Sequence, residues 1–182
     1  TPVAYRERMA QADPAWRDDL ELVMAYQVAR DPVREFRIVP AQPGDQTAQG
    51  IYRFKRPAPR FALLAQWEET PDDQALTLLA SPAFAPLSRA LVAPHPGLAL
   101  PQPSGATQAT VAVRSYRSGN IRLETQTDGP ALLRFAEKHD PSWTVQVDGR
   151  PASLLRVDYL FQGVLLPPGE HEVTFRYSAA SP

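Results

Sequence analysis

The sequence predicts a mostly β protein: an antiparallel β-sandwich of jelly-roll or immunoglobulin-like type in the C-terminal part, preceded by a smaller α+β part. Apolar and polar residues alternate in short runs between Pro130 and Tyr177, as they do in strands with one buried face. Turn residues separate these runs about every ten residues. Proline makes up 20 of 182 residues. This density favours many short elements, because proline is confined to turns, first helical positions and strand edges.

Four alternating runs are expected to build the C-terminal sandwich. They are Ala131–Lys138, Ser142–Val147, Ala152–Phe161 with its continuation to Leu166, and Glu170–Ser178. Asp148-Gly149 is the strongest hairpin signal, since a two-residue turn needs positive φ and Asp-Gly adopts it at low cost. Trp143 shares a face with Val145 and Val147, which favours core packing over sugar binding for this ring.

The upstream part is expected to hold shorter elements. Asp13 followed by Pro14 is a helix cap with proline at the first helical position, which predicts a short helix there. The apolar residues that follow either extend this helix or form a strand, and a strand beginning near Val23 is favoured. Glu35–Val39 and Ile51–Arg56 have β-like composition, and the loop between them is typical of a long hairpin connection.

Phe61–Trp67 is expected to form a further strand. Thr70-Pro71-Asp72-Asp73 then opens a helix over Gln74–Ala80, because a cap, an early proline and two first-turn carboxylates all favour a helix start. Arg89–Ala93 is expected to be a short strand.

The segment Pro94–Gly105 contains four prolines among small residues, which is typical of a linker. It predicts three regions: a small α+β part over residues 1–93, a proline-rich linker over 94–105 and the β-sandwich over 106–178. After the linker, Ala109–Arg117 and Asn120–Thr127 flank Ser118-Gly119 as a hairpin.

Composition excludes several classes of function. The formal net charge of −1 disfavours binding to nucleic acid or to anionic lipid. With no cysteine, the chain has no disulfide and no thiolate nucleophile or ligand. No apolar run approaches the roughly 20 residues needed to cross a bilayer. The chain starts at Thr1 without an initiator methionine, which favours an excised fragment.

Residues that carry chemistry are few. The strong enzyme signatures are missing, and the three histidines are too scattered to predict a metal site, so neither a cofactor nor a metal is expected. Glu137, His139 and Asp140 are the one acid/base candidate and would make a small hydrolase. A charged turn is favoured instead, because neighbouring strand residues point to opposite faces. Asp158 is expected on a strand surface.

Aromatic side chains raise a second functional hypothesis, carbohydrate binding, because aromatic faces stack on the apolar faces of sugars. Trp67 precedes two glutamates at a strand end, where it would be free to bind. Tyr159 and Phe161 lie beside Gly163, where a bulge or a close backbone approach would open one face. Trp67, Tyr159 and Phe161 are therefore the candidate sugar-binding residues.

Four C-terminal segments together resemble a known family. They are Asp140-Pro141-Ser142-Trp143, Val147-Asp148-Gly149-Arg150, Tyr159-Leu160-Phe161-Gln162-Gly163-Val164, and the segment from Pro167 to Tyr177. In this order and spacing they resemble the C-terminal extracytoplasmic module of the YfhO-like bacterial polytopic membrane proteins, which are related to the GT-C lipid-linked glycosyltransferases. Upstream segments around Tyr52 and Pro59 extend the resemblance. Ser142 stands where the family usually has glycine.

The resemblance implies a non-catalytic domain on the extracytoplasmic side of the bacterial cell membrane, as part of a membrane protein. Its partners would be the membrane region of its own parent chain and a glycan or polyprenyl-linked sugar. No catalytic residue carries over, because nothing here matches the family's presumed catalytic carboxylates. The parent would then be a membrane glycosyltransferase. The alternative is a stand-alone carbohydrate-binding β-sandwich module.

Overall fold

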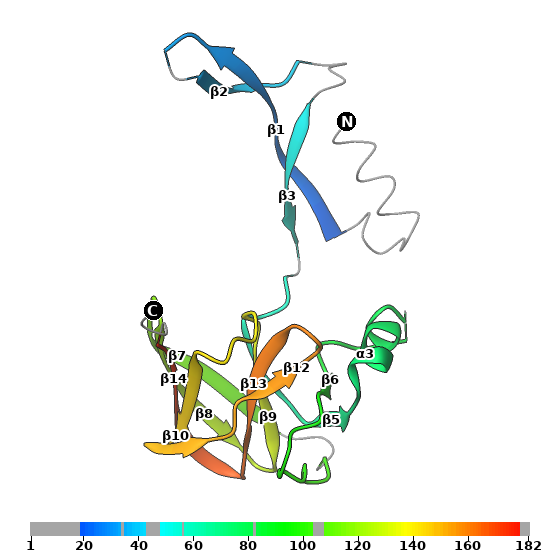
Figure 1. The fold of residues 1–182 in the computed structure, drawn as a ribbon, viewed down its shortest axis with the longest axis vertical. Coiled ribbons are helices and arrows are strands. Elements are labelled where there is room, and N and C mark those ends of the chain that lie inside the picture. The colour runs from blue at the N-terminus through cyan, green and yellow to red at the C-terminus, as the bar shows by residue number, and fades with distance from the viewer. Residues whose placement is uncertain are drawn as a thin grey trace. The chain divides into compact units, whose positions relative to one another are not determined.

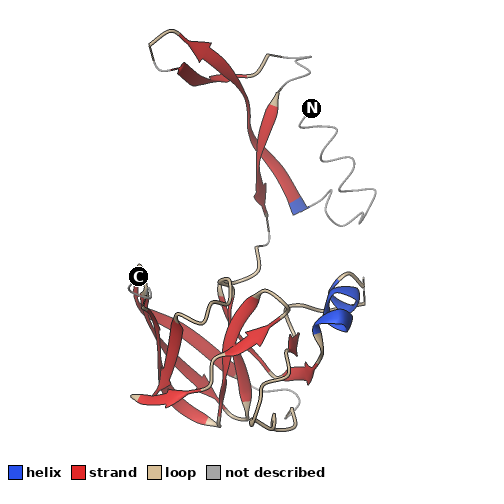
Figure 2. Cartoon of the chain, viewed as in Figure 1, coloured by secondary structure: helices blue, strands red, loops and turns tan. Residues whose placement is uncertain are grey.

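The computed structural model describes residues 19–33, 35–42, 48–55, 57–81, 83–103 and 108–178. The expected fold class is confirmed, since strands dominate the described residues (Figure 2). The chain divides into two compact units, Thr1–Ala58 (unit 1) and Pro59–Pro182 (unit 2). The helix expected at Asp13-Pro14 lies outside the described residues.

Unit 1 contains an antiparallel sheet of three strands in the order β2-β1-β3. The strands are β1 (Leu20–Asp31), β2 (Glu35–Pro40) and β3 (Gln49–Phe54). The strand favoured near Val23 is confirmed and begins three residues earlier. The register of β1 against β3 shifts between Leu22 and Met24. Residue 23 is therefore a bulge, and the side chains that follow it change face.

Cross-strand partners share a face, so the register shows which side chains of this sheet gather together. Met24 lies opposite Ile51, and Val28 lies opposite Ile38. Phe36 has the same alternation as Ile38 and joins them. These five side chains form the apolar face of unit 1, and each is between 42% and 67% exposed.

Unit 2 is a sandwich of two sheets (Figure 1). One sheet has the order β11-β10-β14-β8-β7 and the other β4-β9-β13-β12-β6-β5. The strands are β4 (Phe61–Leu64), β5 (Gln66–Glu69), β6 (Arg89–Val92), β7 (Ala109–Arg117), β8 (Asn120–Thr127), β9 (Ala131–Phe135), β10 (Trp143–Val147), β11 (Arg150–Ala152), β12 (Leu155–Val157), β13 (Phe161–Leu166) and β14 (Gly169–Tyr177). Helix α3 (Asp72–Leu79) follows β5, and of its side chains Ala75 is buried.

Two hydrophobic clusters hold unit 2 together. The first lies between the sheets and combines side chains of both, among them Leu123, Phe135, Val164 and Phe175. The second lies on the opposite face of the six-stranded sheet and includes residues from β4, β5, β6, β9 and β12. Alternation along β9 explains both clusters, because Leu133 points into the first and Leu132 into the second.

The domain boundary expected in Pro94–Gly105 is not where the compact units divide. Leu98 and Leu100, within that segment, pack against the second cluster. The indole Nε1 of Trp67 donates a hydrogen bond of 3.1 Å to the carbonyl of Pro101. The segment therefore covers a hydrophobic face that would otherwise be exposed to water. The strands between residues 61 and 92 belong to the sandwich, because β4 pairs with β9 and β6 with β12.

Turn chemistry was predicted correctly at one hairpin and missed at another. Asp148 and Gly149 both have positive φ, 51° and 74°, between β10 and β11 as expected. Asp158 and Tyr159 also have positive φ, 49° and 64°. They interrupt the single long run expected from Ala152 to Leu166 and turn the chain from β12 into β13. Two adjacent left-handed residues without glycine carry no obvious sequence signal.

Candidate functional site

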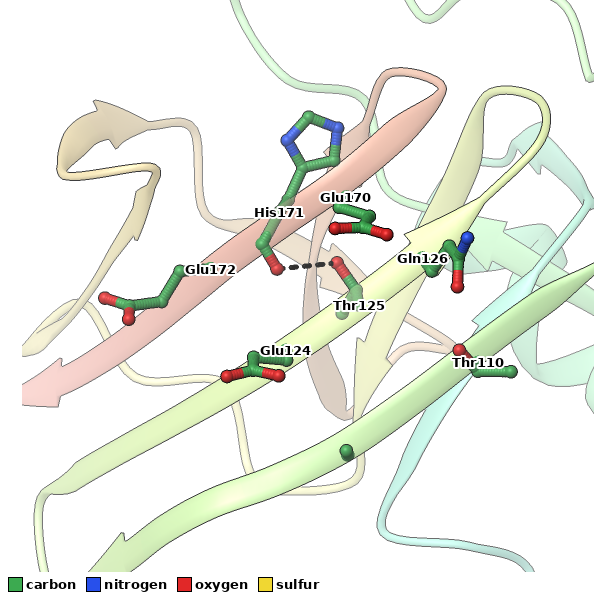
Figure 3. A pocket seen from close by; sticks show the side chains of 8 residues that line it. Thr110, Glu124, Thr125, Gln126, Glu170, His171 and Glu172 are labelled. Atoms are coloured by element: carbon green, nitrogen blue, oxygen red, sulfur yellow. Dashed lines mark hydrogen bonds between the residues drawn. The ribbon is translucent and has the colours of Figure 1, made fainter.

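A polar groove runs across the outer face of β7, β8 and β14 (Figure 3). Its side chains are mainly hydroxyl, amide and carboxylate groups, contributed by Thr110, Glu124, Gln126, Glu170 and Glu172. Alternation places them there, since the intervening residues of β8 and β14 point into the core. The groove can accept hydrogen bonds from hydroxyl groups, but its electrostatics argue against acid/base catalysis.

Two carboxylates in this groove face each other across strands, because Glu124 lies directly opposite Glu172. Arg114 forms an ion pair with Glu124. Its hydrogen bond is the main reason why the pKa of Glu124 lies below its ordinary value. A general acid at neutral pH needs a raised pKa. Glu124 is therefore ionised and paired, and it is unsuited to donate a proton.

His171 lies at the edge of this groove, and its ring points away from the glutamates (Figure 3). The imidazole Nδ1 lies 2.7 Å from Oδ2 of Asp148, and Nε2 lies 3.1 Å from the carbonyl oxygen of Pro167. Oδ1 of Asp148 accepts a hydrogen bond from the Glu172 amide. Together Asp148 and His171 form the turn clasp, which joins the β10–β11 turn to the β13–β14 turn. Its role is structural.

An aromatic cleft opens at the other end of these strands. Its aromatic walls are Tyr116 from β7, Trp143 from β10 and Tyr177 from β14, and Glu137 and Arg117 lie at its rim. Its volume of about 450 Å³ falls within the range of roughly 300–1,000 Å³ that is typical of small-molecule sites. Tyr116 is 51% exposed and Tyr177 is 43% exposed, so both rings are accessible.

The cleft is continuous with the aromatic part of the core. The Trp143 ring packs against Phe135 at 5.6 Å and against Tyr177 at 5.3 Å, measured between ring centroids. Trp143 also contacts the first hydrophobic cluster, which agrees with the core packing favoured for it. The Arg60 guanidinium lies 5.5 Å from the centroid of the Tyr116 ring and forms an ion pair with Glu137. The cleft walls are thus anchored by the core behind them.

The predicted sugar-binding residues do not form one exposed surface. Trp67 is only 5% exposed and belongs to the second hydrophobic cluster, so its ring is not available for stacking on a sugar. Phe161 is half-buried against the same cluster. Tyr159 is 41% exposed and lies in the turn between β12 and β13, where neither of the other two predicted rings is exposed beside it. Burial overrides the strand-end position that made Trp67 a candidate.

Tyr116 and Tyr177 were not among the predicted sugar-binding residues, and Trp143 was expected in the core, because each ring was considered within its own strand. The available signal was their position beside turns: Tyr116 lies two residues before Ser118-Gly119, and Tyr177 and Trp143 occupy strand ends. Strand pairing brings them together, since Trp143 lies opposite Tyr177. The Tyr177 amide donates a hydrogen bond of 2.8 Å to the carbonyl of Gly119, so the β7–β8 hairpin lies beside the end of β14.

The acid/base candidates of the 137–140 segment do not form a working set. Glu137 is engaged with Arg60. Oδ1 of Asp140 accepts a 2.8 Å hydrogen bond from the Ser142 amide, which is the main cause of its lowered pKa. Burial and the nearby Arg156 lower the pKa of His139. Each group has its own local role, as the charged-turn interpretation expects.

Asp158 differs most from its expected place on a strand surface, because it is 6% exposed and forms an ion pair with buried Arg134.

Nowhere in the described residues do three or more histidine, aspartate or glutamate side chains gather so that they could hold a metal ion. Comparison of the chain with models of protein families, with curated proteins and with solved structures finds no match. None of the helices in the described ranges is long and apolar enough to cross a membrane.

Proposed function

We propose that this chain is a non-catalytic extracytoplasmic module of a bacterial polytopic membrane protein of the glycosyltransferase type. It covers or orients the membrane-embedded part of its own parent chain and contacts a glycan or a polyprenyl-linked sugar. The observation that carries the proposal is the apolar face of unit 1. Exposed apolar patches of this kind mark surfaces that bind protein partners or membranes.

The apolar face is made by three strands and is therefore a broad surface rather than isolated side chains. Ile38 and Phe36 are 67% and 60% exposed. The motif resemblance supports the same proposal. Two of the resembling segments supply Asp148 and His171, and these residues form one clasp, as expected if the segments belong to a single module.

Cell fractionation tests the proposal directly. An antibody raised against this chain is used to probe membrane and soluble fractions of the source cells. The expected result is a membrane-bound band several times larger than 20.1 kDa. A soluble band near 20.1 kDa contradicts the proposal.

Site-specific crosslinking tests the role of the apolar face. A photoreactive amino acid at Ile38 is expected to crosslink to the membrane region of the parent chain. The matched control is Arg37, which is exposed but belongs to the opposite face, since its partner Ala29 lies on that side. Equal crosslinking from both positions argues against docking through this face.

A second candidate function is a stand-alone carbohydrate-binding module. The aromatic cleft favours it, because rings of Tyr116 and Tyr177 are exposed in a concave site that also contains a carboxylate. This candidate differs from the first in predicting a soluble native protein of this size. The fractionation experiment therefore separates the two.

A further inference from the structure

We infer that the aromatic cleft binds a neutral hexopyranose unit of a glycan, with the sugar ring against Tyr116, Trp143 and Tyr177. The inference deepens the glycan contact included in the proposed function and rests on that part of it. It assigns this contact to residues other than Trp67, Tyr159 and Phe161.

The shape of the aromatic walls fits a pyranose ring. The rings of Trp143 and Tyr177 are inclined by 60°, so they form a corner rather than a flat platform. A corner contacts both a face and an edge of a sugar ring. The axial C–H groups of a hexopyranose make one face apolar, and such a face packs well on an aromatic ring.

The walls keep their positions when no ligand is bound. Trp143 packs edge-on against Phe135, whose side chain is fully buried, and Phe61 lies 6.3 Å from Tyr116 between ring centroids. The Tyr177 amide is hydrogen-bonded to Gly119. A preorganised site loses less conformational freedom on binding, and this increases affinity.

The rim of the cleft supplies partners for sugar hydroxyls. The Glu137 carboxylate accepts hydrogen bonds, and the ion pair with Arg60 holds it in place. The Arg117 guanidinium lines the same cleft and donates. The cleft therefore offers both an acceptor and donors, as the hydroxyl groups of an uncharged sugar require.

A bilayer surface is the other occupant that exposed tyrosine and tryptophan would fit, because such rings are enriched at membrane interfaces. Trp143, however, is half-buried and packs against Phe135 and Tyr177, so a flat interface would contact the exposed Tyr116 and Tyr177 more readily than Trp143. Glu137 and Arg117 beside the rings offer a hydrogen-bond acceptor and donors that sugar hydroxyls can use. These features favour the sugar ring.

The test uses the full 182-residue chain and follows tryptophan fluorescence and titration calorimetry. The probes are maltotriose, cellotriose, mannotriose, galactotriose and chitotriose. At least one is expected to bind saturably, and Tyr116→Ala is expected to weaken that binding about tenfold. Tyr116→Phe keeps the ring and is expected to keep most of the affinity. Tyr159→Ala removes an exposed tyrosine elsewhere and serves as the matched control.

Circular dichroism and the urea midpoint show whether each variant is folded. If Tyr116→Ala fails to fold, Tyr116→Leu and Tyr177→Leu give the same test, because each removes an aromatic ring with a smaller loss of volume. The inference is overturned if none of the probes binds, or if a folded Tyr116→Ala chain binds the probe as tightly as the wild-type chain. Binding to phosphatidylcholine vesicles through Tyr116, with no response to the saccharides, overturns it in favour of a lipid contact.

The two proposals fail in different ways. A membrane-bound parent protein with no saccharide response leaves the extracytoplasmic module standing and removes the sugar site. A soluble native chain that binds a probe through Tyr116 removes the membrane proposal and leaves the sugar site standing.

Discussion

At the scale of single residues, the turn clasp explains why two short motifs occur in one chain. The Asp148 carboxylate accepts hydrogen bonds from the His171 ring and from the Glu172 amide. The His171 ring also forms a hydrogen bond with the carbonyl of Pro167. Gly169 permits the turn before His171, because its φ of 127° is a conformation that residues with a side chain rarely adopt. The segment Val147-Asp148-Gly149 and the segment from Pro167 to His171 are thus joined by one contact.

Removing the charge of Asp148 tests the clasp. Asp148→Asn keeps a residue that tolerates the positive φ and is expected to lower the free energy of unfolding by about 0.5–1 kcal/mol at neutral pH. The hydrogen bond with His171 is the main cause that lowers the pKa of Asp148 in the folded chain below 3.8. The ionised Asp148 carboxylate therefore stabilises the fold fully at pH values above its pKa in the unfolded chain. This stabilisation is lost as the pH falls through its lower pKa in the folded chain.

The measurement is urea unfolding of both proteins at neutral pH and at about pH 2. The difference in unfolding free energy is expected to shrink in acid. Glu170→Gln removes the same charge beside the clasp and is expected to change little. A difference that stays constant with pH would show that the Asp148 charge does not stabilise the fold.

Gly163 shows a second constraint at residue scale. A Cβ atom at this position would lie 2.6 Å from the carbonyl oxygen of Leu133 and 3.0 Å from Cγ2 of Val157, which confirms the close backbone approach expected there. Gly163→Ala is expected to cost about 1–3 kcal/mol of stability through overpacking. Urea unfolding measures this cost.

Gly97→Ala is the control for Gly163→Ala. Gly97 has a positive φ of 77°, and nothing lies within 4 Å of a Cβ atom built there. Its substitution therefore reports backbone strain alone, about 1 kcal/mol. A Gly163→Ala chain as stable as wild type would mean that β9 and β13 can separate slightly without loss.

At the scale of elements, the buried pair of Arg134 and Asp158 locks three strands together. Nη1 of Arg134, on β9, lies 2.9 Å from Oδ2 of Asp158, at the end of β12. Oδ1 of Asp158 accepts a hydrogen bond of 2.8 Å from the Leu91 amide on β6. Nη1 of Arg134 also donates a hydrogen bond to the carbonyl of Pro86. The pair connects parts of the chain that are far apart in sequence.

Breaking this pair is expected to be costly. Asp158→Asn keeps the left-handed turn and an acceptor for Leu91 but leaves Arg134 as a buried charge without its anion. We expect a loss of about 3 kcal/mol in unfolding free energy. The double variant Arg134→Met with Asp158→Asn is expected to recover part of this loss, because no buried charge remains. If the single Asn variant is as stable as wild type, the pair contributes little.

At the scale of the whole molecule, the position of the division between units is the clearest consequence of tertiary packing. β4 pairs with β9, and the Phe61 ring packs on that of Phe135 at 4.9 Å between centroids. The sandwich therefore needs residues well upstream of 106.

Two fragments test this division. Residues 59–182 are expected to fold cooperatively alone, whereas residues 106–182 are expected to lack a cooperative transition. In the shorter fragment β9 loses its partner β4, β12 loses its partner β6, and the second hydrophobic cluster loses the side chains of β4, β5 and β6. Circular dichroism and urea titration of both fragments provide the measurement. Cooperative folding of the shorter fragment would restore the boundary expected in Pro94–Gly105.

Local pattern was sufficient to predict the mostly β class, the Asp148-Gly149 hairpin, the helix near Gln74 and most strands, because alternation and turn chemistry act over a few residues. The interruption at Asp158 was not predictable, since the left-handed pair Asp158 and Tyr159 contains no glycine and the partner of Asp158, Arg134, lies on another strand.

Which surfaces meet was decided only by tertiary structure. Trp67 is buried because Leu98, Leu100 and the Pro101 carbonyl return to it from beyond a helix and a strand. Tyr116, Trp143 and Tyr177 form a cleft because strands distant in the sequence end at the same place. Strand pairing and burial depend on contacts across the whole chain, and short-range alternation shows which face is apolar without showing what covers it.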